Sequence, residues 1–393
     1  MKKVGTGTSK FILLLSLFFV AHLSLWSQHK LTIYLNHFPL THKGDSIFIA
    51  GNFNNWMPAR HALVEKGDSL AFIQIDSLVK GVYEFKFTRG DWAKVETRSD
   101  GTDVANHLVK LSSDSIVQYS IAGWKDDFSP AVKTHTLSGN VRILDTAFLM
   151  PQLDRTRRIW LYLPPGYASS KKRYPVIYMH DGQNVFDNFT AAFGEWRVDE
   201  CIDSLVEKGK AGCIVVAIDN GPHRMTEYNP YEFKDFGKGE GALYVDFIAN
   251  TLKPFIDRKY RTLPSKLNTI VAGSSMGGLI SYYAMLKYPE VFGKAGVFSP
   301  AFWTAEKIKD LTLDSASSLK GKVFFYMGGL EGDQYINDMK EVTDELGRHS
   351  PALVYVVVDP EASHNEVAWR KWFPEFYTWI MADGFNTVIK LDH

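Results

Sequence analysis

With 393 residues, the chain is too long for one ordinary hydrophobic core and long enough for two domains and a targeting segment. Lysine and arginine together number 44, as do aspartate and glutamate, so the formal net charge is zero. No basic stripe stands out either, which argues against nucleic acid as a partner.

The N-terminal segment is typical of a secretory signal peptide. Three lysines precede an apolar run over residues 11–20, and small and polar residues follow it. This run is shorter than the roughly 20 residues that a membrane-spanning helix needs. We therefore expect residues 1–27 to be a signal peptide, the protein to be secreted or periplasmic, and no membrane span to remain after cleavage.

Residues 29–122 carry the pattern of a small all-β domain. Short runs with apolar residues at every second position are bounded there by Gly, Asn, Asp or Pro. This pattern predicts an immunoglobulin-like sandwich of antiparallel strands. The polar stretch that follows, residues 123–135, contains one proline and is predicted to be a linker.

The hydrophobic pattern of the sequence changes from residue 136 onward, where continuous apolar runs alternate with longer helical patterns. Buried strands separated by helices predict an α/β domain over residues 136–393, with a mostly parallel sheet covered on both faces. Strands are predicted at 158–165, 174–182, 213–220, 268–275, 295–303, 322–329 and 353–360. Helices are predicted at 195–209, 241–260, 277–289 and 334–349.

The stretch from Gly273 to Gly277 matches G-x-S-x-G and lies between a predicted strand and a predicted helix. A serine on such a sharp turn has a strained backbone, and glycines two residues away on either side avoid a collision. The helix that starts there also favours developing negative charge. We predict Ser275 as a nucleophile and assign Ser274 a structural role in the turn.

A serine of ordinary pKa needs a base, and the base needs an orienting acid. His364 lies in the loop after the apolar run at 353–359, where a general base is expected. The acid is expected after the preceding strand, in the glycine-rich loop that contains Glu331 and Asp333. We favour Glu331 because it is nearer the strand end, and Asp333 is the second candidate.

Two backbone N–H groups are predicted to form an oxyanion hole, those of Met276 and Gln183. Aromatic residues are candidates for an acyl pocket, although each could equally pack in the core: Trp196, Phe186 and Trp303. The histidines and carboxylates show no tight metal-ligand spacing, and the mechanism asks for no metal or cofactor, so none is expected. Cys201 and Cys213 are either a disulfide pair or two free thiols.

The chain resembles the putative esterase family in several separated motifs. They read YMHDGQNVFD, GEWRVDE, VAGSSMGGLISYYAMLKYPEVFGKAGVFSPAFW and SHNEVAWR, and the resemblance extends from about residue 140 to 385. That group includes feruloyl and acetyl xylan esterases of carbohydrate esterase family 1, enterobactin esterases and mycolyltransferases. The resemblance implies an α/β-hydrolase fold and a triad of Ser275, His364 and an acid, with Glu331 preferred.

The first domain is similar to glycogen- and starch-binding carbohydrate-binding modules, through IFIAGNFNNWMPA and GVYEFKFTRGDWAKVETRSDGTDVANH. In relatives that bind α-glucan, two tryptophans and a lysine form a sugar platform, and these positions correspond here to Trp56, Lys86 and Trp92. Alternatively, the tryptophans fill the core, or the module packs on the hydrolase domain and walls its cleft.

These observations predict an exported serine esterase that removes acyl groups, preferably feruloyl and otherwise acetyl, from plant polysaccharide or oligosaccharide. The expected partner is therefore an acylated polysaccharide or oligosaccharide. Two different functions stay open: a siderophore-ester hydrolase or an acyltransferase on the same scaffold, and a glucan-binding protein without catalytic activity.

Overall fold

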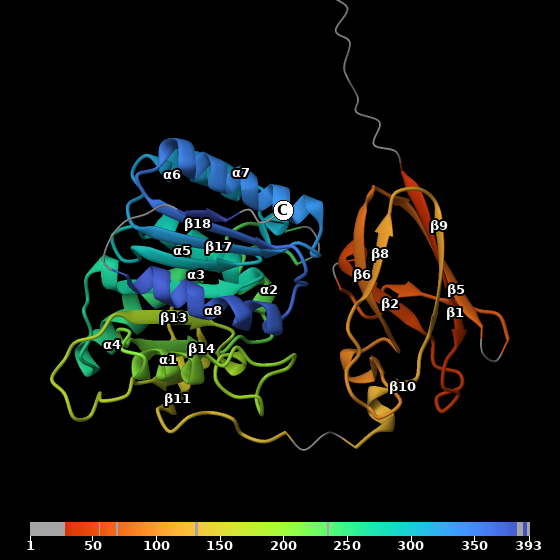
Figure 1. The fold of residues 1–393 in the computed structure, drawn as a ribbon, viewed down its shortest axis with the longest axis horizontal. Helices are drawn as coiled ribbons and strands as arrows, with labels where there is room; N and C mark the ends of the chain where they lie inside the picture. Colours follow the sequence, from red (N-terminus) through yellow and green to blue (C-terminus); the bar gives the residue numbers. More distant parts are fainter. Residues whose placement is uncertain are drawn as a thin grey trace, which may run out of the picture.

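The computed structural model describes residues 28–54, 56–67, 70–129, 133–233 and 236–382, and the backbone of 388–390. The predicted signal peptide, residues 1–27, lies outside these residues. Figure 1 shows a β-domain beside a larger α/β domain. Within the described ranges, no helix is both long and apolar enough to cross a membrane.

The N-terminal domain is a β-sandwich, as the sequence predicts. Its two larger sheets each have four strands, in the orders β4-β5-β1-β9 and β3-β2-β6-β8. The first has one parallel pair, β1 with β9, where the alternation of the sequence predicted only antiparallel strands. The strands are β1 (His29–His37), β2 (Phe48–Gly51), β3 (His61–Ala62), β4 (Val64–Glu65), β5 (Ala71–Leu78), β6 (Gly81–Thr88), β7 (Glu96–Thr97), β8 (His107–Leu111), β9 (Ser115–Ser120) and β10 (Gly123–Trp124).

The sandwich extends further along the chain than the sequence indicated. β10 pairs with β7, and Trp124 is buried against the sandwich core. Near the end of the predicted linker, Lys133 Nζ donates a hydrogen bond to a backbone carbonyl of the α/β domain. Just after the linker, Thr136 N donates to the carboxylate of Asp187. Residues 123–124 at the start of the predicted linker thus pair and pack with the sandwich, and Lys133 near its end contacts the α/β domain. The polar neighbours of Trp124 concealed its role as a core residue.

The α/β domain is built on one sheet of nine strands, in the order β11-β12-β14-β13-β15-β16-β17-β18-β19. The strands β13 to β19 all run parallel to one another. By contrast, β12 is antiparallel to both of its neighbours, β11 and β14. All the predicted strands are confirmed, and they correspond to β12–β18. The bounds are β11 (Val141–Met150), β12 (Arg155–Tyr162), β13 (Val176–His180), β14 (Ile214–Ile218), β15 (Thr269–Ser274), β16 (Lys294–Phe298), β17 (Lys322–Gly328), β18 (Leu353–Asp359) and β19 (Val388–Lys390).

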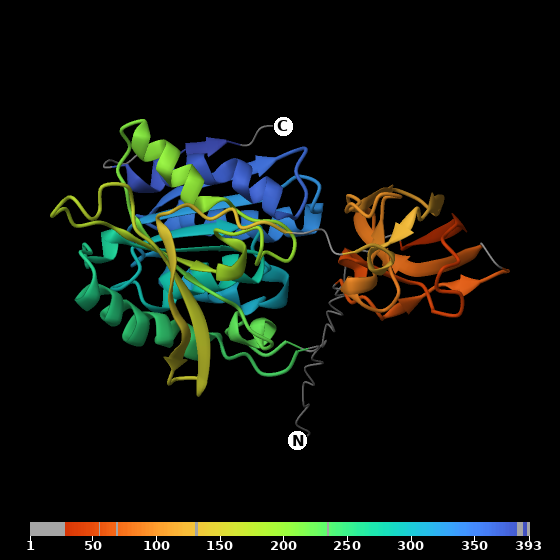
Figure 2. The same ribbon diagram turned by 90° about the horizontal axis from the view of Figure 1, so that it is seen from below.

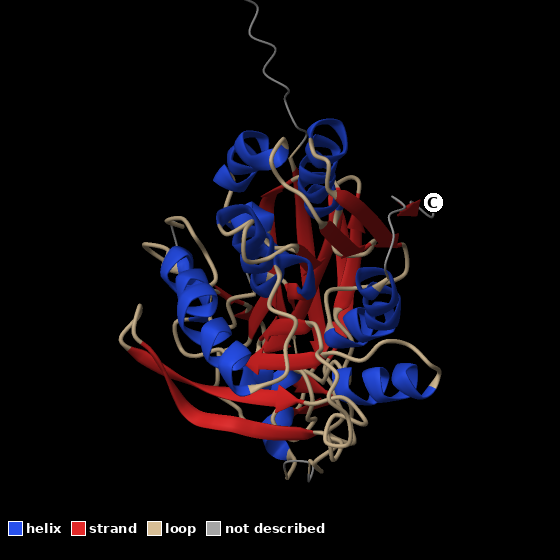
Figure 3. Ribbon diagram, turned by 90° about the vertical axis from the view of Figure 1, so that its left-hand side faces the viewer, coloured by secondary structure: helices blue, strands red, loops and turns tan. Residues whose placement is uncertain are grey.

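Helices cover both faces of this sheet, so that three layers are visible in Figures 2 and 3. α1 and α8 pack on one face, and the residues of α3 to α7 pack on the other. The predicted helices are confirmed, while α2, α6 and α8 were not predicted. The bounds are α1 (Val198–Glu207), α2 (Arg224–Glu227), α3 (Gly241–Phe247), α4 (Lys253–Lys259), α5 (Met276–Lys287), α6 (Lys307–Ala316), α7 (Asp333–His349) and α8 (Glu366–Met381).

The helix predicted over 241–260 contains a change of pitch. A π-helical segment, η5 (Ile248–Leu252), joins α3 to α4, and Pro254 lies in the first turn of α4. Proline has no N–H to donate to the preceding turn, and a wider turn accommodates it. Short 3-10 helices complete the chain: η1 (Asn52–Asn54), η2 (Trp92–Lys94), η3 (Lys125–Asp127), η4 (Gly182–Asn184), η6 (Lys266–Asn268) and η7 (Phe302–Thr304).

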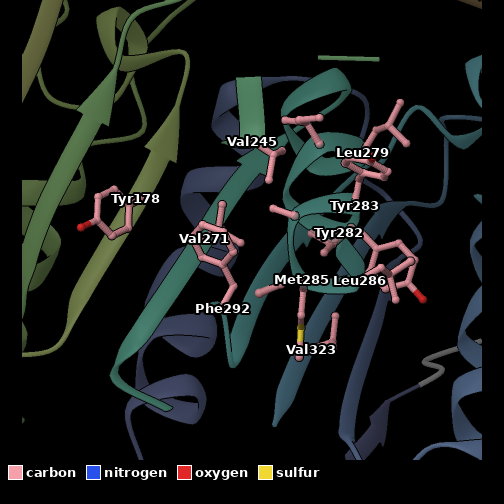
Figure 4. Packing of buried hydrophobic residues seen from close by; sticks show 14 of the residues in the cluster. Tyr178, Val245, Val271, Leu279, Tyr282, Tyr283, Met285, Leu286, Phe292 and Val323 are labelled. Atoms are coloured by element: carbon pink, nitrogen blue, oxygen red, sulfur yellow. The ribbon is translucent and has the colours of Figure 1, made fainter. Parts of the chain in front are cut away.

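The core lies on both sides of the parallel strands, and α5 is its most deeply buried helix. Figure 4 shows Leu279, Tyr282 and Met285 of α5 packed beside Val271 and Val323 of the strands. Every residue of α5 from Met276 to Leu286 is buried, which explains its apolar sequence on all sides. This packing fixes the start of α5 relative to the sheet.

Phe298 tests the packing of the hydrophobic core on the face of the sheet that α1 and α8 cover. Its ring is fully buried and lies 5.0–5.7 Å from four aromatic neighbours, which are Trp196, Phe324, Tyr326 and Phe376. We expect Phe298→Ala to lower the free energy of unfolding by about 3–5 kcal/mol in urea denaturation. Leu313→Ala, at a side chain that is 53% exposed, should change it by less than about 0.5 kcal/mol. Equal effects of the two substitutions would contradict this packing.

Candidate active site

Ser275 lies on a sharp turn between β15 and α5, as predicted. Its backbone has φ 58° and ψ −122°, a strained conformation for a residue with a side chain. Three hydrogen bonds hold this conformation. Ser275 N donates to Phe298 O at 2.9 Å, and Ser275 O accepts from Leu279 N at 3.0 Å and Ala301 N at 3.1 Å.

The glycines around Ser275 are required by the closeness of the neighbouring chain. A Cβ atom on Gly273 would lie 2.9 Å from Gly277 C and 3.0 Å from the His180 ring. A Cβ on Gly277 would meet His180 Cβ at 3.3 Å, a milder contact. Gly278, which the motif does not include, is more restricted, since a Cβ there would lie 2.7 Å from Phe298 O.

The structure pairs His364 with Glu331. His364 Nδ1 lies 2.7 Å from Glu331 Oε2, and Glu331 is buried. The other oxygen, Glu331 Oε1, accepts from Ser299 Oγ at 2.5 Å and from Gly328 N at 2.7 Å. Asp333, the second candidate acid, is exposed at the start of α7. Of the two acids considered, Glu331 is thus the one in contact with the histidine.

Two residues that the sequence did not single out support this pair. Ser299 follows β16, and its hydroxyl also accepts a hydrogen bond of 2.9 Å from Trp369 Nε1. The Trp369 ring lies edge-on to the His364 ring, with centroids 5.0 Å apart. Trp369 comes from α8, which was not predicted, so the sequence offered no position for it.

Ser275, His364 and Glu331 line one cavity, which is partly open to solvent. Because His364 Nδ1 contacts Glu331, Nε2 is the ring nitrogen left for the serine hydroxyl. Ser275 Oγ has no hydrogen bond to another described residue, and such contacts often tighten only when substrate binds. The other lining residues are Asn52, Trp56, Glu84, Ser299, Pro300, Ala301, Trp303, Met327 and Tyr335.

The charge balance favours a basic imidazole. Burial lowers the pKa of His364, but the charge of Glu331 and its hydrogen bond raise it, and the net pKa lies above the ordinary 6.5. A base whose protonated form is stabilised in this way can accept a proton from a serine hydroxyl.

The two predicted oxyanion donors come from separate elements, and neither residue is among those that line the cavity. Met276 is the first residue of α5, where backbone N–H groups have no partner within the helix. Gln183 lies in η4, whose first residue, Gly182, packs directly on β14: a Cβ there would lie 2.8 Å from Ile218 C. The side chain of Gln183 accepts from Asn220 N at 3.1 Å, which fixes this loop.

A buried ion pair anchors the same loop. Asp181 accepts from Arg224 Nε at 2.7 Å and from Asn220 Nδ2 at 2.6 Å. Burial raises the pKa of Asp181, but Arg224 more than offsets it and leaves the pKa below its usual value. The neighbouring His180 is buried, and burial lowers its pKa to about 3, so it stays neutral and does not compete with His364 as a base.

Only one of the three predicted acyl-pocket residues lines the cavity. Trp303 does so, on η7. The assignments of Trp196 and Phe186 are wrong: Trp196 stacks on Trp369 in the core, and Phe186 is buried against Tyr162. Both follow a loop near the site, but their side chains point into the layer beneath α1 and α8.

The predicted sugar-platform residues do not form one exposed surface. Trp56 lines the cavity that contains Ser275. Trp92 lies 6.3 Å from Trp56 and 6.4 Å from Phe193 of the α/β domain, measured between ring centroids. Lys86 is half-buried, and burial lowers its pKa. This placement agrees with the interpretation in which the sandwich walls the hydrolase cleft.

No group of three or more metal-binding side chains occurs among the described residues. Cys201 and Cys213 are both free thiols, and burial raises the pKa of each to about 12. Neither residue lines the cavity. The cavity itself brings together Ser275, His364 and Glu331.

The chain belongs to the putative esterase family, because the family model described as "Putative esterase" matches residues 151–377, more than half of the chain. It is 31% identical over 187 residues to "Uncharacterized protein YbbA" of Bacillus subtilis, across 45% of this chain and 69% of that protein. It is 28% identical over 215 residues to an "Endo-1,4-beta-xylanase/feruloyl esterase" of Xylanibacter ruminicola, across 54% of this chain and 27% of that protein.

Solved structures confirm the α/β-hydrolase fold. The enterobactin esterase FES of Shigella flexneri is 15% identical, with a TM-score of 0.52 over 89% of this chain and 92% of that chain. The BES protein of Bacillus cereus is 20% identical, with a TM-score of 0.52 over 65% of this chain and all of that chain. At these identities the likeness concerns the fold alone.

The contact between Glu331 and His364 predicts a specific titration. We expect the His364 ring to titrate above pH 6.5 in NMR of protein labelled with ¹³C at the histidine rings, with His364→Asn assigning the signal. Glu331→Gln removes the largest of the charges that raise this pKa, so the midpoint should fall, while Glu84 and Glu366 keep part of the rise. The matched control is Asp333→Asn, which should leave the midpoint unchanged. A midpoint that moves in Asp333→Asn and not in Glu331→Gln would reverse the assignment of the acid.

Proposed function

We propose that this protein is an exported serine carboxylic-ester hydrolase that removes acyl groups from plant polysaccharide or oligosaccharide, with feruloyl preferred over acetyl. One observation carries the catalytic part of the proposal. His364, held by Glu331 at 2.7 Å, lines the same cavity as Ser275 on its strained turn. A nucleophile, a base and an orienting acid are thus present in one place.

The proposed reaction passes through an acyl-enzyme. Ser275 Oγ attacks the ester carbonyl carbon while His364 Nε2 takes the hydroxyl proton. The tetrahedral intermediate then expels the alcohol, which receives that proton from His364. Water, deprotonated by His364, attacks the acyl-enzyme in turn, and the carboxylic acid leaves as Ser275 regains its proton.

Two backbone amides are proposed to stabilise the negative oxygen of both intermediates. Met276 N lies at the positive end of α5, and Gln183 N lies in the loop fixed by the ion pair of Asp181 and Arg224. Donors that are already oriented stabilise charge without reorganisation, and each is typically worth a factor of about 10²–10³ in kcat.

The lining of the cavity supports an aromatic acyl group. Trp56, Trp303 and Tyr335 surround the space beside Ser275, together with Met327. Flat aromatic rings bind favourably between such side chains, whereas an acetyl group would leave most of this surface in contact with water. The 28% identity to a xylanase/feruloyl esterase is consistent with this preference.

A siderophore ester is the second candidate substrate. The chain is 31% identical over 152 residues to an "Iron(III) enterobactin esterase" of Dickeya dadantii, across 39% of this chain and 32% of that protein. Acyl transfer to a second alcohol, and glucan binding without catalysis, would each give a different result with the same substrates. Acyl transfer would form product on an added sugar in preference to hydrolysis, and a glucan-binding protein would cleave no ester.

A panel of esters tests the proposal. We expect methyl ferulate to be hydrolysed with a kcat/KM at least about ten-fold above that of methyl acetate, because the aromatic lining binds the feruloyl group. A catecholate siderophore ester and an added xylo-oligosaccharide acceptor complete the panel, with product analysis by liquid chromatography.

The same esters are assayed with the Ser275→Ala variant and with Ser274→Ala as its matched control. We expect Ser275→Ala to lose about 10⁴-fold or more in kcat, while Ser274→Ala keeps most activity. Acetyl turnover equal to or better than feruloyl turnover would remove the feruloyl preference. Faster cleavage of the siderophore ester would favour the second candidate, and a fully active Ser275→Ala would exclude the mechanism.

A further inference from the structure

The sandwich domain supplies part of the cavity wall from one sheet. Side chains alternate along β6: Phe85 and Phe87 point into the sandwich core, so Glu84 lies on the opposite face. This sheet, with β2, β6 and β8, is the one nearer the α/β domain in Figure 1. Glu84 and Asn52 both line the cavity that contains Ser275 and His364.

The Asn54 side chain ties the turn after β2, which carries Asn52, to the strand. Gly51 N donates to Asn54 Oδ1 at 2.8 Å, and Asn54 Nδ2 donates to Ile49 O at 2.8 Å. Trp56 has a positive φ of 56°, which costs energy for a bulky residue and is tolerated where the surroundings enforce it.

Of the two carboxyl oxygens of Glu84, one has a hydrogen-bond partner among the described residues and the other has none. The residue is 2% exposed, and its Oε2 accepts from Asn106 Nδ2 at 2.9 Å. Oε1 is buried and has no hydrogen-bond partner among the described residues. The Ser363 side chain lies close enough to the Glu84 carboxyl to lower its pKa as a weak hydrogen-bond donor, but it makes no hydrogen bond of normal geometry to Oε1. An unpartnered buried carboxyl oxygen is costly, and such exceptions call for a partner that binds from elsewhere.

The surroundings of Glu84 indicate what that partner is. The carboxyl group interacts electrostatically with His364 and Glu331, so it lies close to the catalytic pair. The remaining cavity wall nearby is largely apolar, formed by Trp56, Trp303 and other side chains. A neutral hydroxyl is the ligand group that such an oxygen binds without adding charge, and a carboxyl group can bond a hydroxyl in either protonation state.

We propose that Glu84 of the sandwich domain is a substrate-binding residue of the esterase site, and that its Oε1 hydrogen-bonds a hydroxyl group of the substrate. This inference rests on the proposed ester hydrolysis and extends it. It makes the sandwich a contributor to substrate choice, because esters that lack the hydroxyl leave Oε1 without a partner. The hydroxyl can belong to the acyl group or to the alcohol, and the experiment below distinguishes these.

Two matched pairs of esters test the proposal in the full chain. Methyl 4-hydroxycinnamate and methyl cinnamate differ by a hydroxyl on the acyl group. Cinnamate esters of ethylene glycol and of 1-propanol differ by a hydroxyl on the alcohol. We expect the wild type to prefer the hydroxylated member of one pair by about ten-fold in kcat/KM, mainly through KM. Glu84→Met, of similar length without an oxygen, should abolish this preference, and Glu84→Gln should keep part of it.

Glu96→Gln is the matched control, since Glu96 is a buried glutamate of the same domain whose oxygens contact Phe87 N and His107. It should retain the wild-type preference. The proposal is overturned if the wild type prefers neither hydroxylated ester, or if Glu84→Met keeps the preference. Failure of the wild type to cleave any of these esters would instead contradict the proposed function.

Discussion

The strained backbone at Ser275 is the constraint on which the site depends. A φ of 58° is maintained because the serine is tied to Phe298 and Ala301 on one side and to the buried helix α5 on the other. Gly273 and Gly278 allow the neighbouring backbone to approach to distances that no side chain would permit. The energy stored in this turn is offset by the packing of α5 against the sheet. The position of this serine is thus supported by the core beneath it.

The histidine and its acid are positioned by a second set of contacts. Glu331 is held by Ser299 and Gly328, and Ser299 is held in turn by Trp369 of α8. These contacts join the ends of β16 and β17 to α8, so the acid is fixed before it meets His364. The sandwich domain then closes one side of the cavity with Trp56 and Glu84. Residues of both domains thus line one cavity.

The sequence was sufficient for those features that depend on local geometry and chain order. A strand, a glycine-flanked serine and a helix define the turn, and His364 and Glu331 follow later strands of the same sheet. The side chains of Trp196 and Phe186 could not be placed, because a loop residue near a site can point to either layer. Glu84 was not found at all, since its role depends on contact between domains and not on a motif. β11 was missed because it is an edge strand whose residues are mostly exposed.

Covalent labelling of the nucleophile tests the central claim most directly. After incubation with a fluorophosphonate, which phosphonylates activated serines, intact mass and peptide mapping should show one adduct on Ser275. The His364→Ala variant should be labelled much more slowly, because the hydroxyl then lacks its base. An adduct on Ser274, or labelling of Ser275 at the same rate without the imidazole, would contradict the account.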